Sequence, residues 1–174
     1  INAKFPLHII SYVAESVNRE MLPWSISPSP NIPGLFTCHF YSGQCLWEGT
    51  NVSEGRGTTR PFEIFGAPFI DVLADFNSKE GYENWNDPGN PISDPSVYIR
   101  FIPQFHKFSG EVCSGFQLHP VPGKQYHALA HNLRIMRFIK ESCEGFSFRH
   151  GKYEAGNDKR AIELLCGDPL LVDY

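Results

Sequence analysis

Proline and glycine divide this chain into short segments and leave one long stretch uninterrupted. The 174 residues include 14 prolines and 15 glycines, which break regular structure and favour turns along most of the chain. Neither residue occurs within 124–144, where apolar side chains recur at helical spacing as Leu129, Leu133, Met136, Ile139 and Cys143. We therefore predict one long helix over about residues 124–143, with Gly145 ending it.

Two segments in the middle of the chain alternate apolar and polar residues, as half-buried strands do. They are residues 97–102 and 111–119, and Gly110 between them favours an antiparallel hairpin. Strands and helices are mixed without a regular β-α-β order. The predicted fold class is therefore α+β, with helices packed on a mostly antiparallel sheet.

The second of these strands is expected to have one polar and one apolar face. A period of two places Glu111, Cys113, Gln117 and His119 on one side. The other side carries the residues suited to the core, which are Val112, Phe116 and Leu118. The polar side either lines a cleft or faces solvent, and the sequence leaves both interpretations open.

The remaining elements are predicted from shorter signals. Helices are expected over residues 7–19, 68–78 and 159–166, a buried strand over 44–47, an extended loop over 24–34 and a polar surface segment over 79–96.

Composition excludes several classes of function. The net charge of −4 and the pI near 6.0 argue against nucleic-acid binding, and no apolar run approaches the length of a membrane span. The N-terminus shows no signal-peptide pattern. The five cysteines are scattered without a C-x-x-C pair, and His127 and His131 lack the glutamate and third ligand of a zinc helix. We therefore expect no metal and no cofactor.

The loop from Glu48 to Glu63 concentrates the groups that could carry chemistry. It contains three carboxylates, two arginines, three glycines, three threonines, one asparagine and one serine. Arginine forks suit carboxylates, and the amide and hydroxyl groups suit an acetamido group or sugar hydroxyls. Such a loop favours a small polar ligand with an anionic substituent. Trp47 and Tyr98 are the candidates for stacking on a sugar face.

Other interpretations of this loop stay open. Its arginines and glutamates could satisfy one another as a purely structural network of salt bridges. A phosphate-binding loop is disfavoured, because Gly55-Arg-Gly57 is too short for a dinucleotide fingerprint and no Gly-Lys-Ser/Thr follows. Asn51-Val-Ser53 matches the glycosylation sequon, a pattern that is common by chance.

Several motifs resemble the NamZ-type exo-β-N-acetylmuramidases, formerly a domain of unknown function. The resemblance covers about residues 24–174 and rests on residues 28–33, 45–63, 66–71, 105–113, 115–119 and 162–169. It implies a two-domain enzyme that removes N-acetylmuramic acid from the non-reducing ends of peptidoglycan fragments, with a secreted or periplasmic location. A Rossmann-like N-terminal domain would precede a smaller α+β domain, with the active site between them.

The resemblance also implies a division of labour between the two domains. The catalytic glutamate of the family lies in a Pro-Glu-His-Gly segment of the N-terminal domain, which this chain lacks. We therefore expect residues 1–47 to be the end of that domain and a linker, and 48–174 to be the C-terminal domain. Its partners would be the missing domain and a peptidoglycan-derived sugar.

We expect this chain to supply substrate-binding residues, with Glu54 in a supporting catalytic role. The expected binding residues are Asn51, Arg56, Glu48, Ser53, Thr59, Arg60, Glu111 and His119. A non-catalytic module that binds cell-wall sugars, or a purely structural domain, is the alternative.

Overall fold

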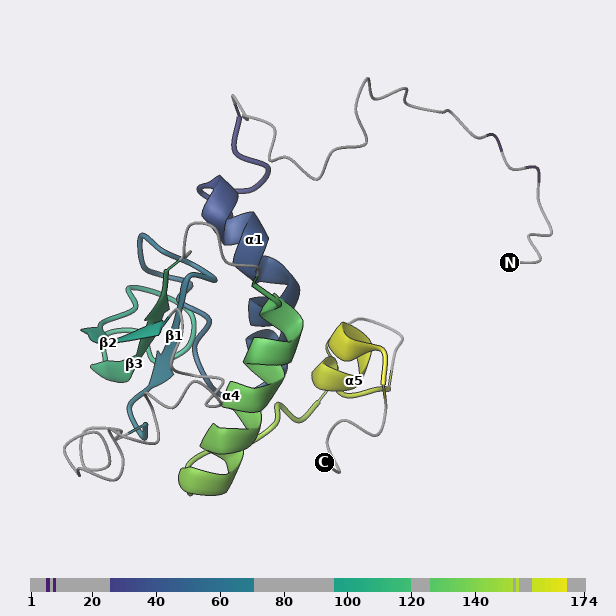
Figure 1. The fold of residues 1–174 in the computed structure, drawn as a ribbon. Helices are drawn as coiled ribbons and strands as arrows, with labels where there is room; N and C mark the ends of the chain where they lie inside the picture. Colours follow the sequence, from purple (N-terminus) through teal and green to yellow (C-terminus); the bar gives the residue numbers. More distant parts are fainter. Residues whose placement is uncertain are drawn as a thin grey trace.

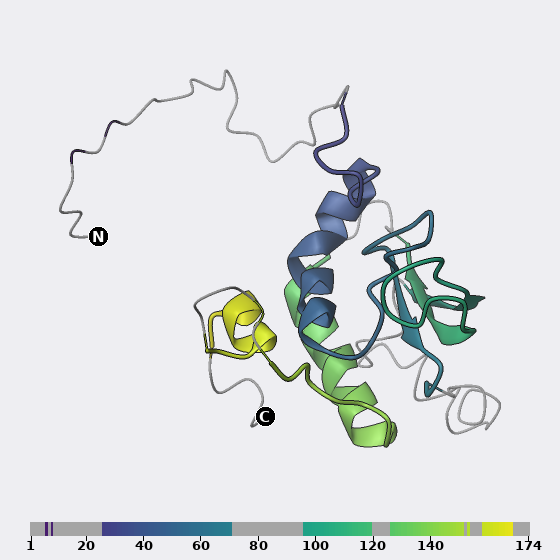
Figure 2. The ribbon, with the colours of Figure 1, turned by 180° about the vertical axis from the view of Figure 1, so that it is seen from behind.

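The computed structural model describes residues 6, 8, 26–70, 96–119, 126–151, 153 and 158–168. Within these ranges a three-stranded sheet has helices on one side (Figures 1 and 2). The predicted α+β class is confirmed. The predicted helix over residues 7–19 lies outside the described residues except for His8, and the predicted surface segment over 79–96 lies outside them except for Ser96. Most of the predicted helix over 68–78 also lies outside them.

The sheet is antiparallel and has strand order β1-β3-β2. Strand β2 (Ser96–Phe101) pairs with β3 (Cys113–Leu118), with Ser96 opposite Leu118 and Phe101 opposite Cys113. The predicted hairpin is confirmed, and Gly110 has the positive φ of 80° expected in its connection. Strand β1 (Ile64–Ala67) pairs with the other edge of β3 and was not predicted. It is buried at all four positions, so it shows no alternation.

The faces predicted for β3 are only partly correct. Phe116 and Leu118 are buried as expected, but Cys113 is also fully buried and Val112 is exposed. The strand begins at Cys113, so Glu111 and Val112 precede it and do not share its alternation. Burial raises the pKa of the Cys113 thiol to about 11.

Helix α1 (Leu35–Gln44) packs against helix α4 (Ala128–Ser142). The two backbones approach closely at Gly43, where an added Cβ would lie 2.2 Å from the carbonyl oxygen of Ala128. Asn132 of α4 accepts a hydrogen bond from Gln44 at 3.0 Å and donates one to the Gly43 carbonyl at 2.8 Å. This buried polar contact fixes the register of the two helices.

The long helix is confirmed, but its predicted apolar stripe is partly wrong. Leu129 is exposed, while the buried face includes Asn132 and His131. These polar side chains are buried because each has a hydrogen-bond partner, which hydrophobicity alone does not reveal. His127 caps the helix by accepting from the Ala130 amide, and His131 lies 2.9 Å from the Tyr126 hydroxyl. Both histidines are therefore structural.

The predicted buried strand over residues 44–47 is wrong. These residues end α1 and begin the 3₁₀-helix η1 (Cys45–Gly49). A short apolar run does not distinguish a strand from a helical turn. Trp47 donates from Nε1 to the side-chain oxygen of Gln44 at 3.1 Å, across one helical turn. The predicted C-terminal helix is confirmed as α5 (Ala161–Cys166), with Gly167 ending it at a φ of 73°.

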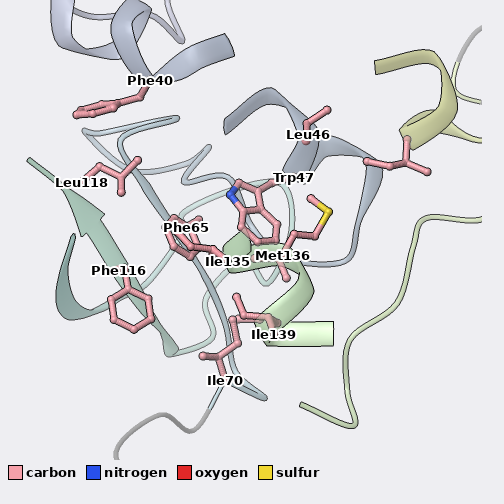
Figure 3. Packing of buried hydrophobic residues seen from close by; sticks show 13 residues of the cluster. Phe40, Leu46, Trp47, Phe65, Ile70, Phe116, Leu118, Ile135, Met136 and Ile139 are labelled. Carbon is pink, nitrogen blue, oxygen red and sulfur yellow. The ribbon is translucent and has the colours of Figure 1, made fainter. Parts of the chain in front are cut away.

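The hydrophobic core lies between the sheet and the helices (Figure 3). The Trp47 ring stacks on Phe65 of β1 with centroids 5.0 Å apart, and Ile135, Met136 and Ile139 of α4 join the same cluster. Because Trp47 is fully buried, the prediction that it stacks on a sugar is wrong. Tyr98 is half-buried, with its ring edge on Phe116. No helix in the described part is both long and apolar enough to cross a bilayer.

Candidate functional site

The loop between η1 and β1 is a tightly bonded structure. The Ser53 amide donates to the Gly66 carbonyl at 2.8 Å, and the reverse bond is 3.0 Å long. The Phe62 amide donates to the Glu54 carbonyl at 2.7 Å, which closes the loop on itself. Its glycine-rich turn lies against residues 104–105, where the Gln104 amide donates to the Gly57 carbonyl at 2.8 Å. The loop therefore holds its side chains in fixed directions.

Glu54 is fully buried at the centre of this structure. Its Oε2 accepts a hydrogen bond from Lys107 Nζ at 2.8 Å. Its Oε1 lies 3.2 Å from Arg56 Nε and 3.2 Å from His106 Nδ1. A buried carboxylate is tolerated only with such partners, and three basic side chains surround this one.

Lys107 joins its own turn to both η1 and the loop. Besides Glu54, its ammonium donates to the backbone carbonyls of Trp47 and Val52, each at 2.8 Å. All three of its protons are thus used inside the protein. Burial lowers the pKa of Lys107, and the Glu54 carboxylate opposes this effect.

Glu48 forms a second ionic group beside Glu54. One of its oxygens accepts from Arg56 Nη2 and the other from the Tyr153 hydroxyl, each at 2.5 Å. Burial alone would raise the pKa of Glu48, but the hydrogen bonds from Arg56 and Tyr153 outweigh it, and the pKa is lowered. The pKa of Tyr153 is raised, through burial and its bond to the carboxylate.

Arg56 connects the two glutamates. Its guanidinium contacts both carboxylates and lies 5.1 Å from the centre of the Phe62 ring, in a cation–π contact. Phe62 has a positive φ of 62°, an unusual conformation for a phenylalanine. The network of salt bridges considered as the structural alternative is therefore present. Glu48, Glu54 and Arg56 belong to it.

The other residues predicted in the loop have different positions. Arg60 is exposed and lies 3.6 Å from Glu63, which accepts a hydrogen bond from Thr37. Thr59 is exposed. No ion pair among the described residues joins Arg60 and Glu63 to the Glu54 cluster.

Asn51 and Ser53 use their side chains within the protein. Asn51 donates to the Gly145 carbonyl at 2.7 Å and accepts from the Ser147 amide at 2.9 Å, so it fastens the loop to residues 145–147. Ser53 is buried, and its hydroxyl accepts from the Gly55 amide at 3.2 Å. Glu111 and His119 are exposed and flank β3 on either side.

An open pocket of about 500 Å³ lies next to the buried cluster. Its described lining residues are Thr50, Asn51, His106, Lys107 and Arg149. Sequence reasoning selected only Asn51 among them. Thr50 belongs to the same loop, and the other three come from two separate segments that only the folded chain brings together. The signal available was the pair His106-Lys107, two basic residues between Phe105 and Phe108 in an otherwise uncharged turn.

The turn that carries His106 has an unusual backbone. His106 has a φ of 73° and Phe108 a φ of 56°, both in the left-handed region. Such conformations cost free energy and persist where the surroundings hold them. Here the Glu54 carboxylate holds both basic side chains of the turn. Among the described residues, no group of three or more potential ligands is arranged to hold a metal ion.

Comparison with known proteins identifies relatives of this chain. A sequence model described as "Exo-beta-N-acetylmuramidase NamZ, C-terminal" matches residues 39–174. The peptidoglycan β-N-acetylmuramidase NamZ of Bacillus subtilis (strain 168) is 38% identical over 127 residues. That alignment covers 71% of this chain and 28% of the Bacillus protein, so the chain corresponds to little more than a quarter of that relative.

Two solved structures share the fold. Both are crystal structures of DUF1343 family proteins from Bacteroides fragilis NCTC 9343. One has a TM-score of 0.59 at 19% identity and covers 87% of this chain and 37% of its own. The other has a TM-score of 0.50 at 22% identity, and the match covers 86% of this chain and 35% of that structure's chain. At these identities the likeness concerns the fold alone.

Proposed function

The chain belongs to the NamZ exo-β-N-acetylmuramidase family, whose C-terminal region it matches, and we propose that it forms the sugar-recognising part of a peptidoglycan glycosidase. The proposed reaction releases N-acetylmuramic acid from the non-reducing ends of peptidoglycan fragments. One observation carries the proposal: within the family-matched residues, an open pocket borders a rigid, charged loop.

The state of the carboxylates supports a recognition role for this chain. Glycosidases use one protonated carboxylic acid and a second carboxylate beside the scissile bond. Glu54 is enclosed by three basic groups, and hydrogen bonds from Arg56 and Tyr153 lower the pKa of Glu48. With its lowered pKa, Glu48 is a poor general acid near neutral pH, and Glu54 is fully buried among its basic partners. We therefore propose that Glu54 positions the residues around it and that the proton donor lies elsewhere in the enzyme.

We also propose that the C-terminal domain begins before α1, earlier than the sequence-based boundary at residue 48. Phe40, Leu46 and Trp47 share one hydrophobic cluster with Phe65 of β1 and Ile135 of α4. A boundary within that cluster would divide a single core. Limited proteolysis tests this proposal, because cleavage near residue 48 in the folded protein would contradict it.

A chimaera tests the proposed function directly. In the Bacillus subtilis relative, the aligned C-terminal region is replaced by residues 35–174 of this chain, and hydrolysis of a chromogenic muramoside is measured. We expect the chimaera to release N-acetylmuramic acid, and the relative truncated before this region to release none. A folded but inactive chimaera, or a fully active truncated enzyme, would count against the proposal.

A non-catalytic module that binds cell-wall sugars is the second candidate. One observation favours it: Glu48 and Glu54 already form ion pairs with Arg56 and Lys107, so neither carboxylate is available for acid–base catalysis. Sedimentation of the chain with purified, insoluble peptidoglycan distinguishes the two. A chain that binds peptidoglycan but fails to restore hydrolysis in the chimaera would favour the binding module.

A further inference from the structure

We propose that the pocket beside Glu54 is a carboxylate-binding subsite in which Arg149 holds the anion and His106 hydrogen bonds to a neighbouring hydroxyl of the same ligand. The choice of ligand rests on the proposed function. The residues themselves are identified by the charges and hydrogen bonds around the pocket. Sequence reasoning had given the anion-binding role to Arg56 or Arg60.

Arg149 is a cation of the pocket that no described carboxylate neutralises. Arg56 and Lys107 are matched by Glu48 and Glu54. Arg149 is exposed on the pocket and forms no ion pair with any residue that the structure describes. Its guanidinium carbon lies 5.9 Å from the centre of the Tyr153 ring. The pocket therefore offers a planar cation, which suits the two oxygens of a carboxylate.

The backbone around Arg149 is fixed although its side chain is exposed. The Arg149 amide donates to the Gly49 carbonyl at 2.8 Å, and neighbouring Phe148 forms a β-bridge with Thr50. The guanidinium thus projects from a segment bonded to the loop itself. An anion bound there would need little reorganisation of the backbone, which favours affinity.

His106 is oriented by the buried carboxylate. Its Nδ1 lies 3.2 Å from Glu54 Oε1. The ring is 41% exposed, which leaves Nε2 available to the pocket. An imidazole nitrogen can donate to or accept from a hydroxyl, so Nε2 suits a hydroxyl of the ligand in either tautomer.

The other lining side chains contribute shape more than hydrogen bonds. The Thr50 hydroxyl already donates to the Trp47 carbonyl and accepts from the Val52 amide. Lys107 donates to three acceptors, and Asn51 bonds to Gly145 and Ser147. Among the described lining residues, Arg149 and His106 are therefore the side chains with hydrogen-bonding groups still available to a ligand. Together they select a ligand with a carboxylate next to a hydroxyl, as in a sugar with an acidic ether substituent.

The experiment compares the affinity of the chain for N-acetylmuramic acid and for N-acetylglucosamine, which lacks the carboxylate, by NMR titration. We expect wild type to prefer the acid by about ten-fold, the value of a charge-assisted hydrogen bond. Arg149→Gln should abolish the preference, and Arg134→Gln, an exposed arginine on α4, should keep it. Because the pocket lies within this chain, no binding at all, or an unchanged preference in Arg149→Gln, would overturn the proposal.

A third ligand identifies which carboxylate is bound. In a muramoyl dipeptide the lactyl group is amidated and the carboxylate lies on the peptide. We expect Arg149→Gln to weaken N-acetylmuramic acid and to leave the dipeptide unchanged, which assigns the lactyl carboxylate to Arg149. If Arg149→Gln weakens the dipeptide alone, the proposed subsite for an acidic ether substituent is overturned.

The chimaera separates this proposal from the proposed function. Hydrolysis by a chimaera whose KM is unchanged by Arg149→Gln would overturn the subsite and leave the muramidase function standing. Carboxylate-selective binding by the chain together with an inactive, folded chimaera would do the reverse. A raised KM with little change in kcat is the expected result, because Arg149 is proposed to bind a group remote from the scissile bond.

Discussion

The Lys107 ammonium donates a 2.8 Å hydrogen bond to the carboxylate of Glu54, which is fully buried. The two residues are 53 positions apart in the sequence. The loop that carries Glu54 and the turn that carries Lys107 are therefore joined by a buried ion pair. The pocket exists because these two segments meet.

Replacing Lys107 by methionine should strongly destabilise the fold. The substitution removes the ammonium and leaves the Glu54 carboxylate and two backbone carbonyls without it. Breaking one side of a buried ion pair costs about 3–5 kcal/mol in the free energy of unfolding, measurable by urea denaturation. Arg137→Gln, which breaks an exposed ion pair on α4, is the matched control and should change little. A loss as small as the control's would contradict the buried pair.

The Glu48 carboxylate should make stability depend on acid pH. Its folded pKa lies below the ordinary value of 4.5, so it stabilises the fold at pH values above about 4.5. That contribution is lost as the pH falls through the folded pKa. The difference in unfolding free energy between wild type and Glu48→Gln should therefore be present at pH 7 and shrink below pH 4.5. A difference that grows in acid would refute the assignment.

Replacing Asn51 by alanine should loosen the attachment of the loop to residues 145–147. Both side-chain hydrogen bonds are lost, and each contributes about 1 kcal/mol. Hydrogen exchange at the Ser147 amide, which bonds to the Asn51 oxygen, should accelerate. Asn51→Asp keeps that acceptor and should protect the amide, and Thr59→Ala, an exposed change in the same loop, should leave it unaffected.

Gly57→Ala tests the contact between the loop and the turn before His106. Gly57 has a φ of 84°, and an added Cβ would lie 2.5 Å from the Phe105 carbonyl oxygen. Gly110 has a similar φ of 80°, but nothing lies within 4 Å of its added Cβ. Both variants should lose about 1–2 kcal/mol from backbone strain. Only Gly57→Ala should lose about 1–3 kcal/mol more from overpacking, and equal losses would exclude a close contact.

Local signals were enough to predict several elements of the fold. The helix α5 with its terminal Gly167, and the pairing of β2 with β3, depend on residues near one another in sequence. Strand β1 was missed because its four residues are all buried. The burial of Leu129 was predicted wrongly because the helix faces its partner with Asn132, whose hydrogen bonds come from residues 88 and 89 positions away.

The candidate site was only half predictable for the same physical reason. The loop 48–63 contains enough charge to be recognised, so Glu54 and Arg56 were found. Arg56 forms ion pairs with Glu48 and Glu54 inside the protein. The same two glutamates also bind Tyr153 and Lys107, which are distant in the sequence. Arg149 and His106 enter the pocket from segments about 95 and 50 positions from the loop. The basic pair His106-Lys107 marks one of these segments, but nothing in the sequence connects either segment with the loop.

The order of the strands constrains how this chain can fold during synthesis. Strand β3 is the middle strand of the sheet but the last of the three in the sequence, and both β1 and β2 pair with it. Until residues 113–118 have left the ribosome, neither earlier strand has its sheet partner, and the apolar side of β1 remains uncovered. Ribosome-bound nascent chains ending before Cys113 should therefore be prone to aggregation and to chaperone capture. The same delay separates Glu54 from its counter-ion, so its charge stays solvated until Lys107 emerges.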